Sequence, residues 1–596
     1  MKSNIQFNPK LYNPRLQILI LLVSAFALYF NTLFNQYAMD DAVVYTENTL
    51  VQKGISAIPQ LLQTDMYFGM GKHDVNLAGG RYRPLSLITF AIEYQFFGLN
   101  PFVSHWVNIL LFLVLVYFLY QLLSRHLFQS AHPLLAFFTC LFFVFHPIHT
   151  EVIANIKSRD EIITMLLMVF SSLSFIHYCQ TKKWFNFLLS MAFFFLACIT
   201  KEAALPMVGL VPLAAYFIYK QNLIQSLRTS IPFLLVAILY FMLRTHVVGW
   251  SHLSGTEIMN FPYAYATPSQ AFATKVWVLI FNGWLLLYPL HLACDYGYNQ
   301  IPYIDIISWQ FICSALLLLG LAAIVINGLK QRRLFAFAIL LMVFTFALCS
   351  NFLFEVGAFL GERFLFQPSL GYSIVLALIF IQLFQRYLYP AILVTSLVLL
   401  GFGCKTILRN QDWKNDETIY FHDVKIVTQS VRANYNVGSQ YLTLALSAKN
   451  PTEKMNYYHQ AEHYDTIALN LYRHYAPIYI DLGMVQLGLN KPLLAAKYWL
   501  MATQLDPLNP LTLKRNSFLS DVLYNQANHC IKSAKIDSAI AYLDLSTQLN
   551  PLNIDAFYNL GQCFFHEKRT QEGLLAWQKV QNLDPNRLSI PNSPAK

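Results

Sequence analysis

Charged side chains are scarce in this sequence. Asp, Glu, Lys and Arg make up 12% of its 596 residues, whereas an average soluble domain has about 25%. Hydrophobic residues reach 56% and aromatic residues 15%. So much apolar surface cannot be buried in one soluble core, so most of the chain must face lipid. The composition therefore excludes an ordinary soluble globular protein.

The sequence also lacks a dense Lys/Arg block and any Cys-x-x-Cys pair among its nine cysteines. The scattered cysteines argue against a disulfide framework and against a structural zinc site. The net charge of +10 favours anionic headgroups and phosphate-bearing ligands over nucleic acid.

Long apolar segments recur through the first two thirds of the chain. A bilayer span takes roughly 17–25 residues. The first run, Leu16 to Phe34, is too long for a signal peptide and has no small-residue cleavage site, so we expect a retained first span. Counting Ala271 to Leu292 as a span would move Lys330 to Arg333 to the outside, so we expect that segment to be re-entrant or interfacial. About eleven spans are predicted, beginning near Leu16, Trp106, Pro133, Ile162, Trp184, Ala204, Ile231, Trp309, Leu334, Leu370 and Ala391.

Lys and Arg residues between the spans predict the orientation, because cytoplasmic loops carry an excess of both. The basic positions that fall on one side are the amino terminus, Arg125, Thr181 to Lys183, Lys220 to Arg228, Lys330 to Arg333 and Arg386. An odd number of spans then puts everything after Lys405 outside the cytoplasm.

The composition changes after Cys404, where charged and amide residues return with a helical period. Leu549-Asn550-Pro551 and Leu583-Asp584-Pro585 stand 34 residues apart, which is the tetratricopeptide period. About ten extra residues are expected around 510–519. The predicted fold class is therefore all-α: a polytopic transmembrane helical bundle followed by an α-solenoid of about four repeats. Its predicted parts are a membrane domain at 1–405 with a large outer loop at 35–104, a linker at 406–432, repeats at 433–586 and a flexible tail at 587–596.

The predicted outer loops carry the chemistry. Asp40 and Asp41 follow the first span directly, where adjacent carboxylates can act as a general base and its orienter, or bind a cation. A helix N-cap with a solvated neighbour is the alternative. Arg81 and Arg83 flank Tyr82 and could clamp a phosphate or diphosphate. Snorkelling to lipid headgroups is the alternative for them.

More charged clusters fall on the same predicted side. The residues are His146, His149 and Glu151, followed by Arg159, Asp160 and Glu161; then Lys201 and Glu202; then Glu362 and Arg363. A His-x-x-His pair has the spacing of metal ligands, but two such histidines alone are a weak signal, so we predict no metal and no required cofactor. Charges gathered on one face favour an outer-leaflet active site over a transporter, which places them at mid-membrane in broken helices.

These motifs form an ordered set along the chain. They are Asp40-Asp41; Tyr82-Arg83-Pro84-Leu85; Gly98-Leu99-Asn100-Pro101-Phe102; Phe145 to Glu151 with Arg159-Asp160; Thr200-Lys201-Glu202; Ser350-Asn351; Gly361 to Gly371; and Arg409-Asn410 with Trp413. The set resembles the transmembrane and tetratricopeptide-repeat O-mannosyltransferases, members of the GT-C superfamily. Gly361 stands where that family usually has Ala, and the repeat array is shorter than in eukaryotic members.

The resemblance implies an inverting glycosyltransferase. A mannose-like sugar would pass from a polyprenyl-phosphate carrier to a hydroxyl, expected to be a protein Ser or Thr held by the repeats. We accordingly assign catalysis to Asp40, Asp41 and Glu362; donor-phosphate binding to Arg81, Arg83, Arg159, Lys201 and Arg363; and supporting positions to His146, His149, Glu151, Asp160 and Glu202.

The short array suggests a bacterial relative that uses undecaprenyl phosphate. We then expect a cytoplasmic amino terminus and periplasmic repeats, or repeats in the endoplasmic reticulum lumen if the source is eukaryotic. A non-catalytic membrane-anchored scaffold for protein–protein interaction remains the alternative, although one span would suffice to anchor it. A transporter lacks support, since paired inverted halves are not visible in the sequence.

Overall fold

The structure is a computed structural model that describes residues 12–70, 80–249, 258–507 and 510–587. The chain divides into two compact units, Met1–Val427 and Thr428–Lys596, and each is described by itself. Within the described residues all regular elements are helical, which confirms the predicted all-α class.

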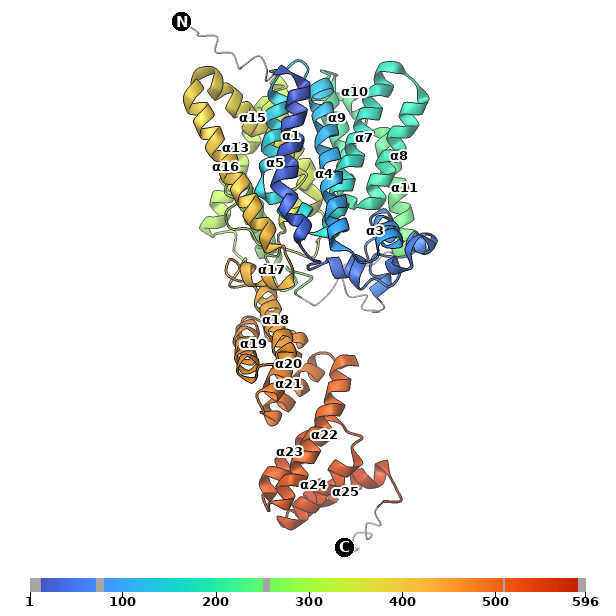
Figure 1. Cartoon of the computed structure of the whole chain (residues 1–596), viewed down its shortest axis with the longest axis vertical. Helices are drawn as coiled ribbons and strands as arrows, with labels where there is room; N and C mark the ends of the chain where they lie inside the picture. The colour runs from blue at the N-terminus through green and yellow to red at the C-terminus, as the bar shows by residue number, and fades with distance from the viewer. Residues whose placement is uncertain (1–11, 71–79, 250–257, 508–509, 588–596) are drawn as a thin grey trace. The chain divides into compact units, whose positions relative to one another are not determined.

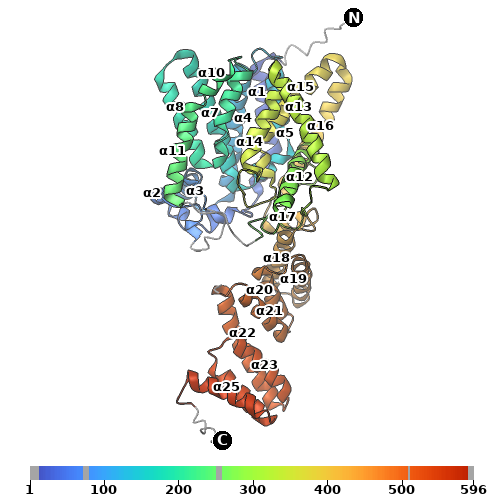
Figure 2. The same cartoon turned by 180° about the vertical axis from the view of Figure 1, so that it is seen from behind.

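The first unit is a bundle of long helices that run side by side (Figure 1 and Figure 2). Its apolar bundle helices are α1 (Pro14–Tyr29), α4 (Pro101–Leu122), α5 (Leu135–Phe145), α7 (Arg159–Thr181), α8 (Trp184–Thr200), α9 (Met207–Phe217), α11 (Ile231–Val248), α12 (Pro268–Leu287), α13 (Trp309–Gln331), α14 (Leu334–Phe346), α15 (Pro368–Arg386) and α16 (Leu388–Asp412). Short elements join them: α2 (Ile58–Leu61), α3 (Pro84–Phe97), α6 (Thr150–Ala154), α10 (Leu223–Arg228), α17 (Asp416–Asp423) and several 3-10 turns.

Local sequence explains where these helices begin. Proline opens α1, α4, α12 and α15, where its missing N–H costs nothing and its fixed φ suits the first turn. Asn100 caps α4 by accepting from the Val103 N–H, and Thr267 caps α12 in a reciprocal capping box.

The predicted spans all correspond to helices in the structure, and these helices differ in length. Among the described helices, eight are long and apolar enough to cross a membrane, and a ninth candidate is the pair Leu135–Phe145 and Pro147–Ala154, bent by 57°. Three shorter apolar helices are Trp184–Thr200, Glu202–Phe217 and Leu334–Cys349. α5 and α8 are short because their ends fall at His146-Pro147 and at Lys201, where the backbone turns extended. The charged motifs thus shorten the helices that the apolar pattern alone would extend.

Both ends of α12 contact the same end of the bundle. Near its start, Phe272 packs against Phe311 and Phe352 with ring centroids 6.0 and 6.1 Å apart. Near its end, the Leu286 carbonyl accepts a hydrogen bond from His146 Nε2 at 3.0 Å. The helix α12 is itself one of the eight that are long and apolar enough to cross a membrane, so the re-entrant or interfacial placement of 271–292 stays a prediction.

The second unit contains four consecutive helical hairpins, as the repeat pattern predicts. They are α18 (Val431–Ser447) with α19 (Pro451–Leu471), α20 (Ala476–Gly488) with α21 (Pro492–Leu505), α22 (Pro510–Lys532) with α23 (Ile536–Leu549), and α24 (Ile554–His566) with α25 (Thr570–Leu583). The extra residues around 510–519 lengthen α22, which has 23 residues where α20 and α24 have 13 each.

A glycine–tryptophan contact closes two of the hairpins. Gly483 packs against Trp499 and Gly561 against Trp577, and each indole N–H donates to a backbone carbonyl, at 3.0 and 3.2 Å. In the first hairpin the corresponding glycine is Gly438, and it packs against the buried carboxyl group of Asp465 instead of a tryptophan.

Residues 406–432 contain the end of α16 and all of α17. The predicted tail at 587–596 lies outside the described residues from 588 onward.

Candidate functional site

The charged motifs meet at one end of the first bundle, which we call the site end. In Figure 1 it is the end at which α3 and α17 lie. α1 and α16 both end there. Asn35, which follows α1, donates through Nδ2 to the carbonyl of Asn410 near the end of α16, at 2.9 Å. At the opposite end Arg332 follows α13 and donates to the Gln221 carbonyl, beyond α9, at 2.9 Å. The basic turns therefore lie across the bundle from the acidic motifs.

The adjacent acids Asp40 and Asp41 have different environments. The Asp41 side chain is buried, with Oδ2 accepting from the Ala38 N–H at 2.9 Å and Oδ1 from the Lys157 N–H at 2.7 Å. Burial raises the pKa of Asp41 to about 7, against the opposing effect of these two backbone hydrogen bonds. Asp40 is 48% exposed, and its Oδ2 lies 3.5 Å from Lys157 Nζ. Asp40 is therefore the accessible carboxylate, whereas Asp41 binds the backbone N–H groups of Ala38 and Lys157.

The turn that presents Asp40 is strained. Met39 adopts a left-handed φ of 56°, which is uncommon for a residue other than glycine. Its N–H donates to Asp416 Oδ1 at 2.6 Å, which fastens the turn to α17. Strain of this kind persists only where the surroundings fix it, and it concentrates at functional sites.

Arg363 lies beside this pair of acids. Glu151 accepts two hydrogen bonds from Arg363. Its Oε1 lies 2.6 Å from the guanidinium Nη1, and its Oε2 lies 2.8 Å from the backbone nitrogen of Arg363. The Arg363 side chain is 21% exposed and stacks over Phe364 at 5.1 Å. Asp40 is close enough to act on it electrostatically. Asp40, Lys157, Glu151 and Arg363 therefore form one cluster, in which Lys157 and Glu151 are buried and Asp40 and Arg363 are open to solvent.

Beneath this cluster lies a buried charge network. Arg83 donates through Nε to Glu202 at 3.0 Å and through Nη1 to Asp160 at 3.0 Å. Lys201 Nζ lies 3.0 Å from Asp160 and 2.8 Å from Glu161. Taking one partner from such a network leaves an uncompensated buried charge and costs about 3–5 kcal/mol. Arg83 and Lys201 are therefore held by carboxylates.

Arg159 is fully buried and ties α7 to α3 and α4. Its Nε donates to Asn108 at 2.8 Å, its Nη2 lies 2.8 Å from Glu93, and its plane covers Phe90 at 4.3 Å. Arg81 differs, because no hydrogen bond or ion pair engages its half-buried side chain among the described residues. Arg81 is near enough to Glu202 to act on it electrostatically.

The two histidines have structural partners. His146 Nε2 donates to the Leu286 carbonyl, and His149 Nε2 lies 2.7 Å from Ser369 Oγ. In the part of the chain that the structure describes, no three His, Cys, Asp or Glu side chains are grouped so as to hold a metal ion.

Glu362 is buried, and neither of its carboxyl oxygens has a hydrogen-bond partner among the residues that the structure describes. Arg409 Nη2 lies 3.9 Å away and is itself held by Asp423, 2.7 Å from its Nη1. Burial raises the pKa of Glu362 well above its ordinary value. Glu362 therefore sits behind the open cluster, beside the Arg409–Asp423 pair.

Sequence reasoning missed Lys157, Glu93 and Asp423, and it named Arg409 only as part of a motif, without a role in the site. Lys157 had a visible signal, since it is a charge in the break between two apolar helices, in the turn Ile156–Ser158 that precedes Arg159. Arg409 and Asp423 were beyond local patterns, because their partnership joins α16 to α17.

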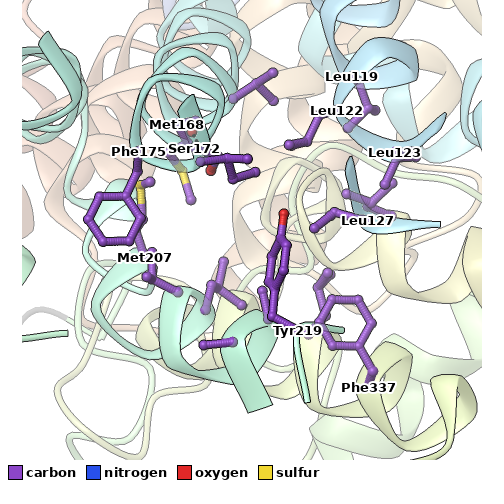
Figure 3. A pocket seen from close by; sticks show the side chains of 18 of the residues that line it. Leu119, Leu122, Leu123, Leu127, Met168, Ser172, Phe175, Met207, Tyr219 and Phe337 are labelled. Atoms are coloured by element: carbon purple, nitrogen blue, oxygen red, sulfur yellow. Dashed lines mark hydrogen bonds between the residues drawn. The ribbon is translucent and has the colours of Figure 1, made fainter. Parts of the chain in front are cut away.

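An apolar cavity of about 360 Å³ lies within the bundle. It is lined by α4, α7, α9, α14 and α15, and Figure 3 shows Leu119, Met168, Phe175 and Tyr219 around it. Gln367 lines it at the site end, four positions after Arg363; this amide is buried and its polar atoms have no hydrogen-bond partner. Ligand pockets typically measure about 300–1,000 Å³. The cavity therefore has the size and apolar lining of a site for a hydrocarbon chain.

Known proteins give an independent comparison. Residues 84–250 match the family model described as dolichyl-phosphate-mannose-protein mannosyltransferase. The human protein O-mannosyl-transferase TMTC3 is 23% identical over 95% of this chain and 64% of its own length. Human TMTC1 is 26% identical over 68% of this chain and 51% of its own, and protein O-mannosyl-transferase F38B6.6 of Caenorhabditis elegans is 26% identical over 71% and 59%. The chain thus spans less than two thirds of the length of these relatives.

Solved structures were also compared. The tetratricopeptide-repeat protein YrrB is 19% identical, with 35% of this chain and 93% of YrrB covered, at a TM-score of 0.17. The complex of Cut9 with Hcn1 from the APC/C is 12% identical over 91% of this chain and 96% of that one, at a TM-score of 0.19. Scores this low support no argument, and the helical hairpins themselves define the fold of the second unit.

Proposed function

The chain is a relative of the protein O-mannosyl-transferases, and from that premise we propose that it transfers a mannose-like sugar from a polyprenyl phosphate to a hydroxyl of a protein. The observation that carries this proposal is the open cluster of Asp40, Lys157, Glu151 and Arg363. It offers an accessible carboxylate beside cations, in a bundle whose apolar cavity reaches the same end.

Asp40 is the proposed general base. Its carboxylate accepts the proton of the acceptor hydroxyl, whose oxygen attacks the anomeric carbon of the sugar. The bond from that carbon to the phosphate oxygen breaks, and polyprenyl phosphate leaves with the electron pair. Attack from the face opposite the leaving group inverts the anomeric configuration. General base catalysis typically contributes about 10²–10⁴-fold.

The candidate donor-phosphate residues take different parts in this proposal. Arg363 and Arg81 have guanidinium groups that are not fully engaged, so they are suited to touch the phosphate directly. Arg83, Arg159 and Lys201 are held by carboxylates. Their part is to keep Asp160, Glu202 and Glu93 charged and fixed beneath the site.

The apolar cavity supports a lipid-linked donor. Its Gln367 end stands next to the Glu362–Leu365 turn that carries Arg363. An isoprenoid tail in the cavity would leave its phosphate at the open cluster, where Arg363 and Asp40 lie. Apolar burial contributes roughly 25 cal/mol per Å².

We assign the site end to the non-cytoplasmic face, because the basic turns gather at the other end. α16 finishes at the site end, where the Gln36 N–H donates to the Lys414 carbonyl at 2.8 Å. The chain therefore leaves the bundle on the side of the active site, and the repeats are proposed to bind the protein acceptor there. A bacterial periplasm or the lumen of the endoplasmic reticulum provides that compartment.

The proposal is tested by presenting the full chain in lipid nanodiscs with radiolabelled donors and a protein extract as acceptor. Polyprenyl-phosphate mannose should deliver label to protein, whereas the matched sugar nucleotide, GDP-mannose, should not. Label transferred from the nucleotide alone, or from neither donor, would overturn the proposal and favour a membrane-anchored scaffold.

A further inference from the structure

Lys157 touches both acids of the Asp40–Asp41 pair. Its backbone N–H donates to Asp41 Oδ1 at 2.7 Å, and its Nζ lies 3.5 Å from Asp40 Oδ2. It stands in the 3-10 turn Ile156–Ser158, between α6 and α7. One residue therefore fixes the position of the acidic turn and supplies a cation to its exposed member.

The Lys157 side chain is 2% exposed, yet its ion pair with Asp40 is long. An N–H···O hydrogen bond normally measures 2.7–3.2 Å, and an ammonium has three donors. The buried neighbours Arg83 and Lys201 each have two carboxylate partners at about 3 Å or less. A buried charge that is poorly compensated favours a further anion beside it.

The charged groups around this pair come from several elements. Lys157 is acted on by Asp160 at the start of α7, Lys201 before α9, Arg363 of the Glu362–Leu365 turn, and Asp40. Asp40 also acts on Asp41 and on Tyr420 of α17. An anion that lies against Lys157 and Arg363 must therefore compete with Asp40.

The geometry points to Lys157 as a positioning residue that exchanges one anion for another: it pairs with Asp40 in the free protein and with the donor phosphate in the complex. This inference rests on the function proposed above. A nearby cation makes a carboxylate a weaker base. When the phosphate of the isoprenoid donor takes the ammonium, Asp40 becomes the stronger base, so the base is activated only when a donor is bound.

Thermodynamic linkage makes this exchange measurable. If the donor phosphate and the Asp40 carboxylate compete for one ammonium, then removing the carboxylate charge must tighten donor binding. Such coupling typically amounts to about 5- to 150-fold.

The experiment measures binding of radiolabelled polyprenyl-phosphate mannose to the full chain in nanodiscs, without acceptor. Asp40→Asn should bind the donor about tenfold tighter than wild type. Lys157→Met should bind about tenfold more weakly, and Lys157→Arg should retain binding. In the Lys157→Met background, Asp40→Asn should change nothing.

The outcomes separate the two proposals. If wild type binds no polyprenyl-phosphate mannose, the proposed function fails, and this inference fails with it. If wild type binds the donor but Asp40→Asn binds it equally or more weakly, the exchange is wrong while the function survives. Thermal unfolding of each variant shows whether it folds. Should Lys157→Met fail to fold, the Asp40→Asn arm still decides, because Asp40 is exposed.

Discussion

Buried carboxylates occur in both units of this protein, with opposite surroundings. At the site end Asp160 is held by Arg83 and Lys201, at 3.0 Å each. In the repeats the buried Asp465, on α19, has no hydrogen-bond partner for either oxygen, and Asp481, on α20, has none for Oδ2. The Asp160 network compensates its buried charge with partners, whereas burial raises the pKa of Asp465 and Asp481 in the repeats and so favours their neutral forms. Pairing fixes geometry for chemistry, and lack of pairing makes stability depend on pH.

Of the substitutions that test this comparison, Asp160→Asn should have the largest effect on stability. It leaves Arg83 and Lys201 facing a neutral amide in a buried site, and removing one partner of a buried pair costs about 3–5 kcal/mol. We expect a clearly lower unfolding temperature for this variant in nanodiscs, measured by differential scanning fluorimetry. Exposed Asp305→Asn, in another loop at the site end, is the matched control and should unfold like wild type. Equal unfolding temperatures for both variants would show that the network is not coupled to folding.

The pH dependence of the repeats sharpens the comparison. Burial raises the pKa of Asp481 to about 6, and burial together with the charge of Asp481 raises the pKa of Asp465 well above its ordinary value. Both groups bind protons more tightly in the folded repeats than in the unfolded chain. The contribution of Asp481 is therefore fully present below about pH 4 and is lost as the pH rises through about 6. The contribution of Asp465 is lost as the pH rises through its own raised pKa. The loss for Asp481 is on the order of 3 kcal/mol.

Hydrogen exchange of the full chain, corrected for intrinsic rates, measures this effect. Protection of α19 and α20 should fall between acidic and neutral pH, while α24 and α25 serve as the internal reference. Asp465→Asn should flatten the dependence. Protection that rises with pH in α19 and α20 would contradict the neutral-acid account.

Arg363→Lys removes the fork of guanidinium donors while keeping the charge. Glu151 is held by two bonds from Arg363, one of which comes from the backbone and survives the change. An ammonium cannot reproduce bidentate recognition of a phosphate, so we expect a roughly tenfold higher donor KM, about 1.4 kcal/mol. Steady-state kinetics at varied donor concentration measure it. An unchanged KM would show that Arg363 binds only Glu151 and does not bind the donor phosphate.

The smallest expected effect is that of Trp577→Phe in the last hairpin. It deletes the hydrogen bond from the indole to the Tyr558 carbonyl, which is worth about 1 kcal/mol, and keeps most of the packing on Gly561. Protection of α24 and α25 should decrease slightly, at all pH values alike. A loss of protection that depends on pH would contradict the distinction between α24 and α25 and the pH-sensitive helices α19 and α20.

Local patterns predicted the helices and the repeats, because helical period, proline starts and the 34-residue spacing are properties of short segments. They also predicted which motifs share one end of the bundle. Each predicted span corresponds to a helix, but hydropathy does not register that the helices break at His146 and Lys201, so the short lengths of α5 and α8 were not predicted.

The partner of each charge could not be predicted from the sequence. Asp40 and Asp41 are adjacent and chemically identical, and they differ only because Asp41 meets the Lys157 N–H from a distant segment. Arg83 and Arg363 stand in similar aromatic contexts, yet one is buried between two carboxylates and the other is partly exposed. Such differences arise from tertiary packing, which a single sequence does not reveal.

The account depends most directly on Asp40, and one assay tests it. Transfer of label from polyprenyl-phosphate mannose to protein is compared for wild type, Asp40→Asn and the exposed control Asp305→Asn, all in nanodiscs and all folded. We predict that Asp40→Asn loses at least about a hundredfold in rate, while Asp305→Asn transfers like wild type. Near-normal transfer by Asp40→Asn would contradict the account.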